Sequence, residues 1–182
     1  MLRGELGQIA TFKNHALLAY VRHGSSGEFK LVLTQSDDQG RSWHASGVIT
    51  SRLPIGLPSV AVDGRGDIAV VYDEIKSDGI VCGDNPPNAE IPARTIVAVS
   101  RDRGHSWKTV TVGANWWNFG AGGAFKFFGG YWVADYQGIA ATPHGFITAT
   151  PQGPAMSGKE PIGGITGDMS IVAGEISVRS EH

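Results

Sequence analysis

Several side chains in this sequence have the chemistry to act on, or to hold, a sugar or an acidic ligand. Asp73 and Glu74 are neighbouring acids at the end of an apolar run, so they are candidates for a general acid and base. Arg94 leads into another apolar run, and its guanidinium is suited to binding a carboxylate. Trp116 and Trp117 begin a cluster rich in aromatic residues, whose faces stack on sugars and on choline-like cations.

Each of these candidates also has a purely structural interpretation. The two acids could be solvated loop carboxylates, the arginine could form a surface ion pair, and the tryptophans could pack in the core or between sheets. The sequence leaves both interpretations open.

No metal or other cofactor is expected from the remaining reactive residues. The six histidines show no spacing typical of metal ligands, and no glycine-rich phosphate loop joins a strand to a helix. Cys82 is the only cysteine, which excludes an intrachain disulfide and a cysteine-rich metal site.

The charge balance argues against nucleic acid and anionic membranes as partners. Lys plus Arg number 15 against 17 for Asp plus Glu, which gives a net charge of -2. The first six residues lack the apolar segment of a signal peptide, and no stretch reaches the roughly 18 apolar residues of a membrane-spanning helix. We expect the chain as given to be soluble, and its compartment stays unknown.

An internal repeat indicates the elements that must position these residues. Two octets share the pattern Ser-x-Asp-x-Gly-x-Ser-Trp and start 64 residues apart; they comprise Ser36, Asp38, Gly40, Ser42 and Trp43, and Ser100, Asp102, Gly104, Ser106 and Trp107. A short β-type segment precedes each octet and another follows it. A repeat of this period predicts propeller blades or a solenoid, with each octet forming the turn of a hairpin.

The residue types within the octets explain how such a turn would form. The aspartate can accept hydrogen bonds from backbone N–H groups of its own loop, the glycine can adopt the positive φ of a tight return, and the serines can add hydroxyl bonds. The tryptophan that closes each octet is expected to anchor its hairpin on the neighbouring sheet. We therefore predict a structural role for the octets.

Three further hairpins indicate how many sheets the chain forms. They are predicted around residues 7–20, 58–73 and 138–149, each with a turn between two β-type segments. We expect a single all-β domain over residues 1–182, with blades at about 1–53, 54–116 and 117–182. The third lacks an octet and ends where a fourth strand should begin.

The two octets resemble the Asp-box of bacterial neuraminidase repeats, and the resemblance covers both copies and the strands around them. It implies a β-propeller of four-stranded antiparallel blades, with the Asp-box between the third and fourth strands and away from the active-site face. Sialidase-like rings have six blades, so about three blades correspond to half of a ring or to a fragment. A homodimer or a missing half is then expected to complete the ring.

The resemblance also suggests Tyr136 as a catalytic nucleophile. Sialidases use a tyrosine activated by a glutamate, an aspartate as acid or base, and three arginines that hold the substrate carboxylate. Tyr136 stands just before a first strand, as the sialidase nucleophile does, and Arg94 could line the central channel. The glutamate expected ahead of the preceding blade is absent from residues 53–59, and so is the Phe/Tyr-Arg-Ile-Pro segment.

The sequence is compatible with two functions. One is a sialidase-like Asp-box module that binds a glycan or a protein partner without turnover, with Arg94, Asp73, Glu74, Trp116 and Trp117 as candidate contacts. The other is part of an exo-sialidase-like glycoside hydrolase with Tyr136 as the nucleophile. Whether the chain is an enzyme is left open.

Overall fold

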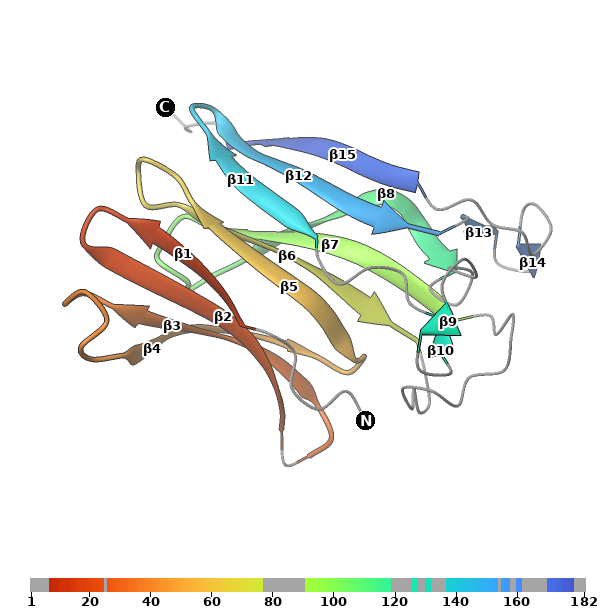
Figure 1. Ribbon diagram of the computed structural model, residues 1–182, viewed down its shortest axis with the longest axis horizontal. Coiled ribbons are helices and arrows are strands. Elements are labelled where there is room, and N and C mark those ends of the chain that lie inside the picture. Colours follow the sequence, from red (N-terminus) through yellow and green to blue (C-terminus); the bar gives the residue numbers. More distant parts are fainter. Residues whose placement is uncertain are drawn as a thin grey trace.

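The structure is a computed structural model that describes residues 7–24, 26–76, 91–118, 126–127, 130–131, 137–153, 155–157, 160–161 and 170–178. Within these residues the regular structure is entirely β, and every strand pair is antiparallel (Figure 1). The prediction of an all-β fold is therefore confirmed.

Three sheets make up most of the molecule. Sheet 1 has the order β1-β2-β3-β4, with strands Gln8–Phe12, His15–His23, Phe29–Ser36 and His44–Ser51. Sheet 2 has the order β5-β6-β7-β8, with strands Ile55–Val62, Ile68–Ile75, Pro92–Ser100 and Lys108–Asn118. Sheet 3 has the order β11-β12-β15, with strands Gly138–Thr142, Gly145–Gln152 and Ser170–Ser177.

Two short hairpins accompany the large sheets. They pair β9 (Lys126–Phe127) with β10 (Gly130–Tyr131), and β13 (Met156–Ser157) with β14 (Glu160–Pro161). The first hairpin precedes sheet 3 in sequence, and the second lies between its strands β12 and β15.

Each octet forms the turn between the third and fourth strands of a four-stranded sheet. In the first, Asp38 accepts hydrogen bonds from the Ser42 backbone N–H (2.8 Å), the Ser42 hydroxyl (2.6 Å) and the Ser36 hydroxyl (2.9 Å). The Gly40 N–H donates to Ser36 Oγ at 2.7 Å, and Gly40 has a φ of 87°. These bonds close the loop on itself without help from another segment.

The second octet repeats this geometry. Asp102 accepts from the Ser106 backbone N–H (2.8 Å), the Ser106 hydroxyl (2.6 Å) and the Ser100 hydroxyl (2.7 Å). The Gly104 N–H donates to Ser100 Oγ at 2.7 Å, and Gly104 has a φ of 92°. The same residue types therefore build the same turn twice.

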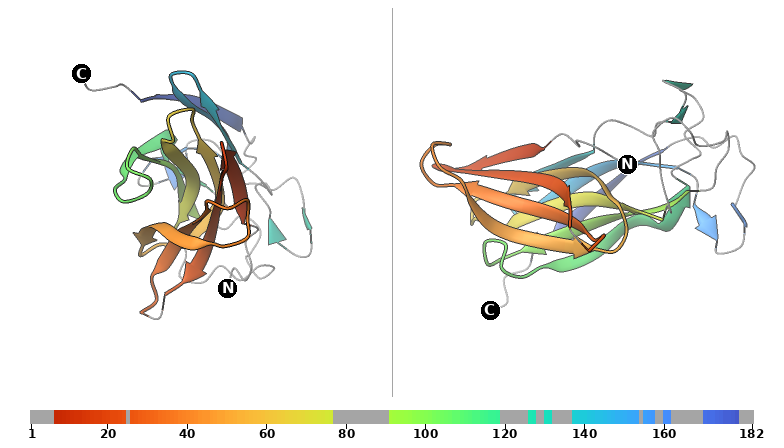
Figure 2. Two further views of the ribbon diagram at one scale, coloured as in Figure 1. Left: turned by 90° about the vertical axis from the view of Figure 1, so that its left-hand side faces the viewer. Right: turned by 90° about the horizontal axis from the view of Figure 1, so that it is seen from below.

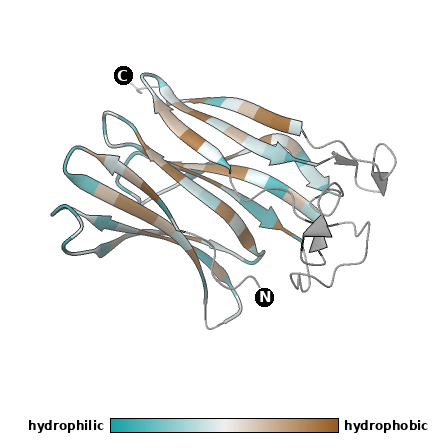
Figure 3. Ribbon diagram, viewed as in Figure 1, coloured by the Kyte–Doolittle hydropathy of each residue, from teal (hydrophilic) through white to brown (hydrophobic). Residues whose placement is uncertain are grey.

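The sheets pack face to face, with sheet 2 between the other two (Figures 1 and 2). One apolar layer joins sheets 1 and 2 and includes Leu31, Leu33, Val70 and Ile96. A second layer joins sheets 2 and 3, where the buried ring of Phe146 packs with residues of β6 and β7. Because side chains alternate across a strand, sheet 2 supplies apolar residues to both layers, as the brown bands in Figure 3 indicate.

The first strands of the three sheets, β1, β5 and β11, lie side by side. The amide of Gln137 donates to the Leu57 carbonyl at 2.5 Å, which ties the start of β11 to β5. Sheet 3 has three strands in the described part of the chain, and the three sheets do not close into a ring.

The two octet tryptophans differ in their surroundings. Trp107 is partly buried and packs against the layer between sheets 1 and 2, although its indole N–H has no hydrogen-bond partner among the described residues. Trp43 is 41% exposed, and its indole donates to the Gly40 carbonyl at 3.2 Å. Within the described part of the chain Trp43 does not anchor its hairpin on another sheet, because no described sheet covers that side of sheet 1.

This difference predicts unequal effects of truncating the two side chains. Trp107→Ala should lower the free energy of unfolding by about 3 kcal/mol. This is the lower end of the range for truncating a large aromatic side chain, because the ring is only partly buried. Trp43→Ala should lower it by less than about 1 kcal/mol. Urea denaturation of both variants, at protein concentrations at which the chain is monomeric, measures this, and equal losses would contradict the packing described here.

The octet carboxylates also predict a dependence of stability on acid. Hydrogen bonds from Ser42 hold the pKa of Asp38 at about 2, and those from Ser106 hold the pKa of Asp102 at about 2. Both values lie below the ordinary 3.8, so these groups stabilise the fold above about pH 4 and lose that contribution as the pH falls towards 2. Unfolding free energies measured from pH 5 to pH 2 should decline less steeply for Asp102→Asn and Ser106→Ala. An unchanged slope in both variants would refute this assignment.

Candidate functional site

The predicted binding residues gather at the end of sheet 2 opposite its octet turn. There β6 ends at Ile75, where it pairs with Ala93 of β7, whereas Ile68 pairs with Ser100 at the octet end. The last residues of β8 complete this edge beside the first residues of β7. The end of β6, the start of β7 and the end of β8 thus lie together at one end of the middle sheet (Figure 1).

On the face of sheet 2 towards sheet 1, an ion pair lies beside an aromatic ring. Arg94 donates through Nε at 2.9 Å and Nη2 at 2.5 Å to Oε2 of Glu74, which faces it directly across the strands. The guanidinium carbon of Arg94 lies 5.0 Å from the ring centroid of Trp116. Glu74 is buried and Arg94 is about one third exposed, so the pair is half open to solvent.

A second cation lies over the same ring. Lys76 Nζ is 4.0 Å from the centroid of Trp116, within the range of a cation–π contact. Lys76 forms no ion pair with any residue that the structure describes. Two cations and one carboxylate therefore surround Trp116, which leaves one net positive charge.

Tyr72 lies two residues before Glu74 on the same strand face. Burial and, to a smaller extent, the charge of Glu74 raise the pKa of Tyr72 to about 12. Its side chain belongs to the layer between sheets 1 and 2. Tyr72 is therefore a neutral phenol at ordinary pH.

The opposite face of sheet 2 carries a separate buried polar network. Asp73 is fully buried and accepts a hydrogen bond from the Thr95 hydroxyl at 2.8 Å. Gln152 of sheet 3 donates to Thr95 Oγ1 at 3.1 Å and to the Val112 carbonyl at 2.7 Å. This network joins sheets 2 and 3 by polar contacts at the end where their apolar layer stops.

Three of the sequence-based expectations need correction. Asp73 and Glu74 do not form a pair of acids, because consecutive residues of β6 point to opposite faces and each carboxylate has its own partners. Neither is a solvated loop carboxylate, since both lie in β6 and are buried. Trp117 is fully buried among Ile75, Ile91 and Ala93, so it cannot contact a ligand.

The remaining predicted residues have mixed outcomes. Arg94 and Trp116 meet at one place, together with Glu74. Tyr136 lies outside the described residues, so the structure gives it no position. The sequence pattern did not single out Lys76, although the alternation of β6 places residue 76 on the same side as Glu74. Nor did it single out Gln152, which no local pattern connects to Asp73.

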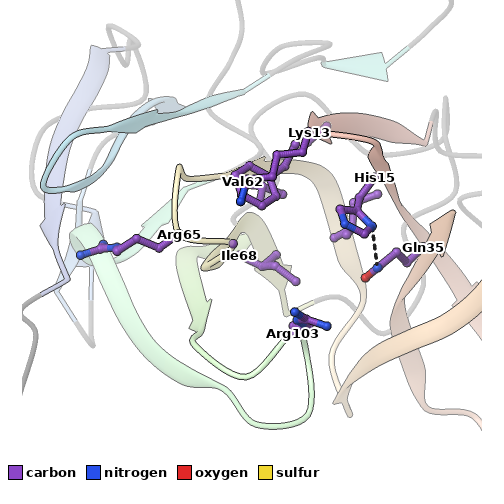
Figure 4. Close-up of a pocket in the computed structure, with 11 residues that line it drawn as sticks. Lys13, His15, Gln35, Val62, Arg65, Ile68 and Arg103 are labelled. Carbon is purple, nitrogen blue, oxygen red and sulfur yellow. Dashed lines mark hydrogen bonds between the residues drawn. The ribbon is translucent and has the colours of Figure 1, made fainter. Parts of the chain in front are cut away.

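A recess lies at the octet end, between sheets 1 and 2 (Figure 4). It has a volume of about 150 Å³ and is lined in part by Lys13, His15, Gln35, Arg65 and Arg103. Arg65 is held by Asp63 at 2.7 Å and lies 3.3 Å from Asp67, while His15 pairs with Asp37 at 2.5 Å. Most of its polar side chains are therefore occupied by partners within the fold.

The described residues offer neither a metal cluster nor a membrane-spanning helix. They contain no group of three or more His, Cys, Asp or Glu side chains that could hold a metal ion. Among them there is also no helix long and apolar enough to cross a membrane.

Comparison of the chain with protein-family models and with curated proteins gave no match.

The ion pair beside Trp116 predicts a measurable energetic coupling. Replacing Glu74 by Gln, Arg94 by Gln, and both together should show a coupling energy of about 1 to 2 kcal/mol, because one partner is buried and the other is partly hydrated. Denaturation of the four proteins of this double-mutant cycle measures it. Additive effects would mean that the two side chains do not interact in solution.

Proposed function

We propose that this chain is an Asp-box propeller module that binds an acidic glycan through Trp116, Lys76 and Arg94. Three observations support the propeller part of this proposal: antiparallel meander sheets, first strands that lie side by side, and two octet turns of one design between third and fourth strands. The octet turns lie at one end of the sheets and the proposed site lies at the other, as the resemblance to Asp-box proteins implies.

The single observation that carries the binding proposal is the aromatic ring bearing two cations. Indole faces stack on the C–H surfaces of sugars, and lysine and arginine bind carboxylates. Glu74 neutralises part of Arg94 and fixes its direction, whereas Lys76 keeps its charge available and is exposed at the end of β6. An anionic sugar suits this combination better than a neutral one.

The geometry of the described residues gives less support to a hydrolase. Glycoside hydrolysis commonly needs two carboxyl groups on either side of the scissile bond, and Asp73 and Glu74 point away from each other. Glu74 is also held by Arg94, which keeps its carboxylate occupied. Turnover through Tyr136 is therefore the alternative that the experiment must test.

Binding is tested by titrating the protein with 3′-sialyllactose and with lactose. We expect only the sialylated sugar to bind. Its affinity should fall about tenfold or more, which is about 1.4 kcal/mol, in Trp116→Ala, which removes the stacking surface, and in Lys76→Ala, which removes a charged contact. Lys108→Ala is the matched control and should bind normally. It removes an exposed lysine at the octet end of β8, the strand that carries Trp116. Equal binding of both sugars, or an equal loss in the control, would overturn the proposed site.

Hydrolysis is tested with a fluorogenic sialoside. The proposal expects no turnover by the chain. Turnover that disappears in Tyr136→Phe would instead establish the hydrolase and end the proposal of binding alone.

A further inference from the structure

The outward face of sheet 1 carries apolar side chains at positions that sheet 2 buries. The strand pairing shows which positions of the two sheets correspond. In the third strands, Thr34 and Ala98 are 64 residues apart, as the octets are. Thr34 pairs with Leu18 and Ala98 pairs with Val70, so Leu18 corresponds to Val70. Continuing that register, Ile9 corresponds to Val60, Tyr20 to Tyr72 and Val32 to Ile96. The two sheets can therefore be compared position by position.

The comparison shows that this face is covered throughout sheet 2, whereas in sheet 1 Val32 is as buried as Ile96 (6% each) and the other compared positions are more open. Val60 is 6% exposed and Ile9 is 60% exposed. Tyr72 is buried whereas Tyr20 is half-buried, and Trp107 packs between sheets whereas Trp43 is open. Sheet 1 thus presents the kind of face that sheet 2 buries against its neighbour.

The octet turns differ in the same way. A Cβ at Gly104 would lie 2.7 Å from the Ser46 carbonyl oxygen, so the second octet turn rests on the backbone of β4. A Cβ at Gly40 would meet no atom of the described residues within 4 Å. The first turn therefore has the shape of the second turn but lacks the contact that the second one makes.

The outward face of sheet 3 has the complementary character. Phe146 and Val172 point towards sheet 2, so Ile147 and Ile171 point away from it, and these are 46% and 72% exposed. By the repeat register this face corresponds to the face of sheet 2 that carries Ala69, Val71 and Val97, all of them buried. Its other members include the exposed residues Ala140, Ala149 and Ala173, together with Glu175, an exposed acid that pairs directly with Ile147.

We propose that sheet 1 of one copy packs on sheet 3 of a second copy, and sheet 3 on sheet 1, so that two chains close a six-sheet ring. The two contacts are identical and related by a two-fold axis, so the assembly closes and leaves neither face open. Each contact repeats the packing that already joins sheets 1 and 2 within the chain, with Trp43 in the role of Trp107. This inference rests on the propeller arrangement proposed above and is independent of glycan binding.

A second copy is favoured over other occupants because one chain supplies both complementary faces. A partner that covered sheet 1 alone would leave Ile147 and Ile171 in water, and a partner that covered sheet 3 alone would leave Ile9 and Trp43 exposed. Exposed apolar side chains gathered on one sheet face are typical of interaction sites. Two copies remove both faces from water with no other component.

The experiment measures solution mass by light scattering during size-exclusion chromatography. The unaltered chain is expected to be a dimer, and Ile9→Lys and Ile147→Glu should each weaken dimerisation by tenfold or more. An equimolar mixture of the two variants should again form a dimer, with one native contact and one contact between the introduced lysine and glutamate. Val110→Lys is the matched control, since Val110 is 47% exposed on β8 and lies on neither outward face.

Each outcome decides the proposal. A monomer at all concentrations, or a dimer unaffected by Ile147→Glu, would overturn it. A dimer that Ile9→Lys weakens and Ile147→Glu does not would mean that sheet 1 pairs with itself. Far-ultraviolet circular dichroism and the melting temperature of each variant show whether the fold persists, and these exposed positions are expected to leave both unchanged. Glycan binding measured on the same samples separates failure of this contact from failure of the binding site.

Discussion

Packing of one sheet face against the next is the constraint on which the structure depends. Sheet 2 has apolar side chains on both faces, and it can exist in water only because sheets 1 and 3 cover them. The octet turns make this possible, because an aspartate that satisfies its own loop lets the chain reverse without a partner segment. The compact turn then lets Gly104 approach the backbone of β4 closely.

The same constraint explains where chemistry can occur. Apolar layers fill the middle of the sheets, and the buried carboxylates Asp63, Asp73 and Glu74 lie at or near strand ends. Glu74 and Arg94 tolerate partial burial because each satisfies the other, and Trp116 shields the pair on one side. The cation that remains, Lys76, is the more exposed of the two.

The order of the residues and their local pattern were sufficient to predict the repeated parts of the fold. The octets predicted their turns because every group that the turn needs lies within eight residues, and alternating apolar runs predicted the strands on either side. The sequence also pointed to Arg94, Glu74 and Trp116 individually. It could not show that they meet, because their contact depends on the pairing of three strands whose registers are set by long-range packing.

The features that can be read from the amino-acid order are therefore local: two turns closed by their own aspartates, and the strands that they join. Which faces are covered depends on how the sheets pack. Trp43 and Trp107 close octets of the same pattern and differ in burial, because only Trp107 has a neighbouring sheet in the described part of the molecule. Packing likewise separates Asp73 from Glu74, since the pleat of a strand sends adjacent side chains into different environments.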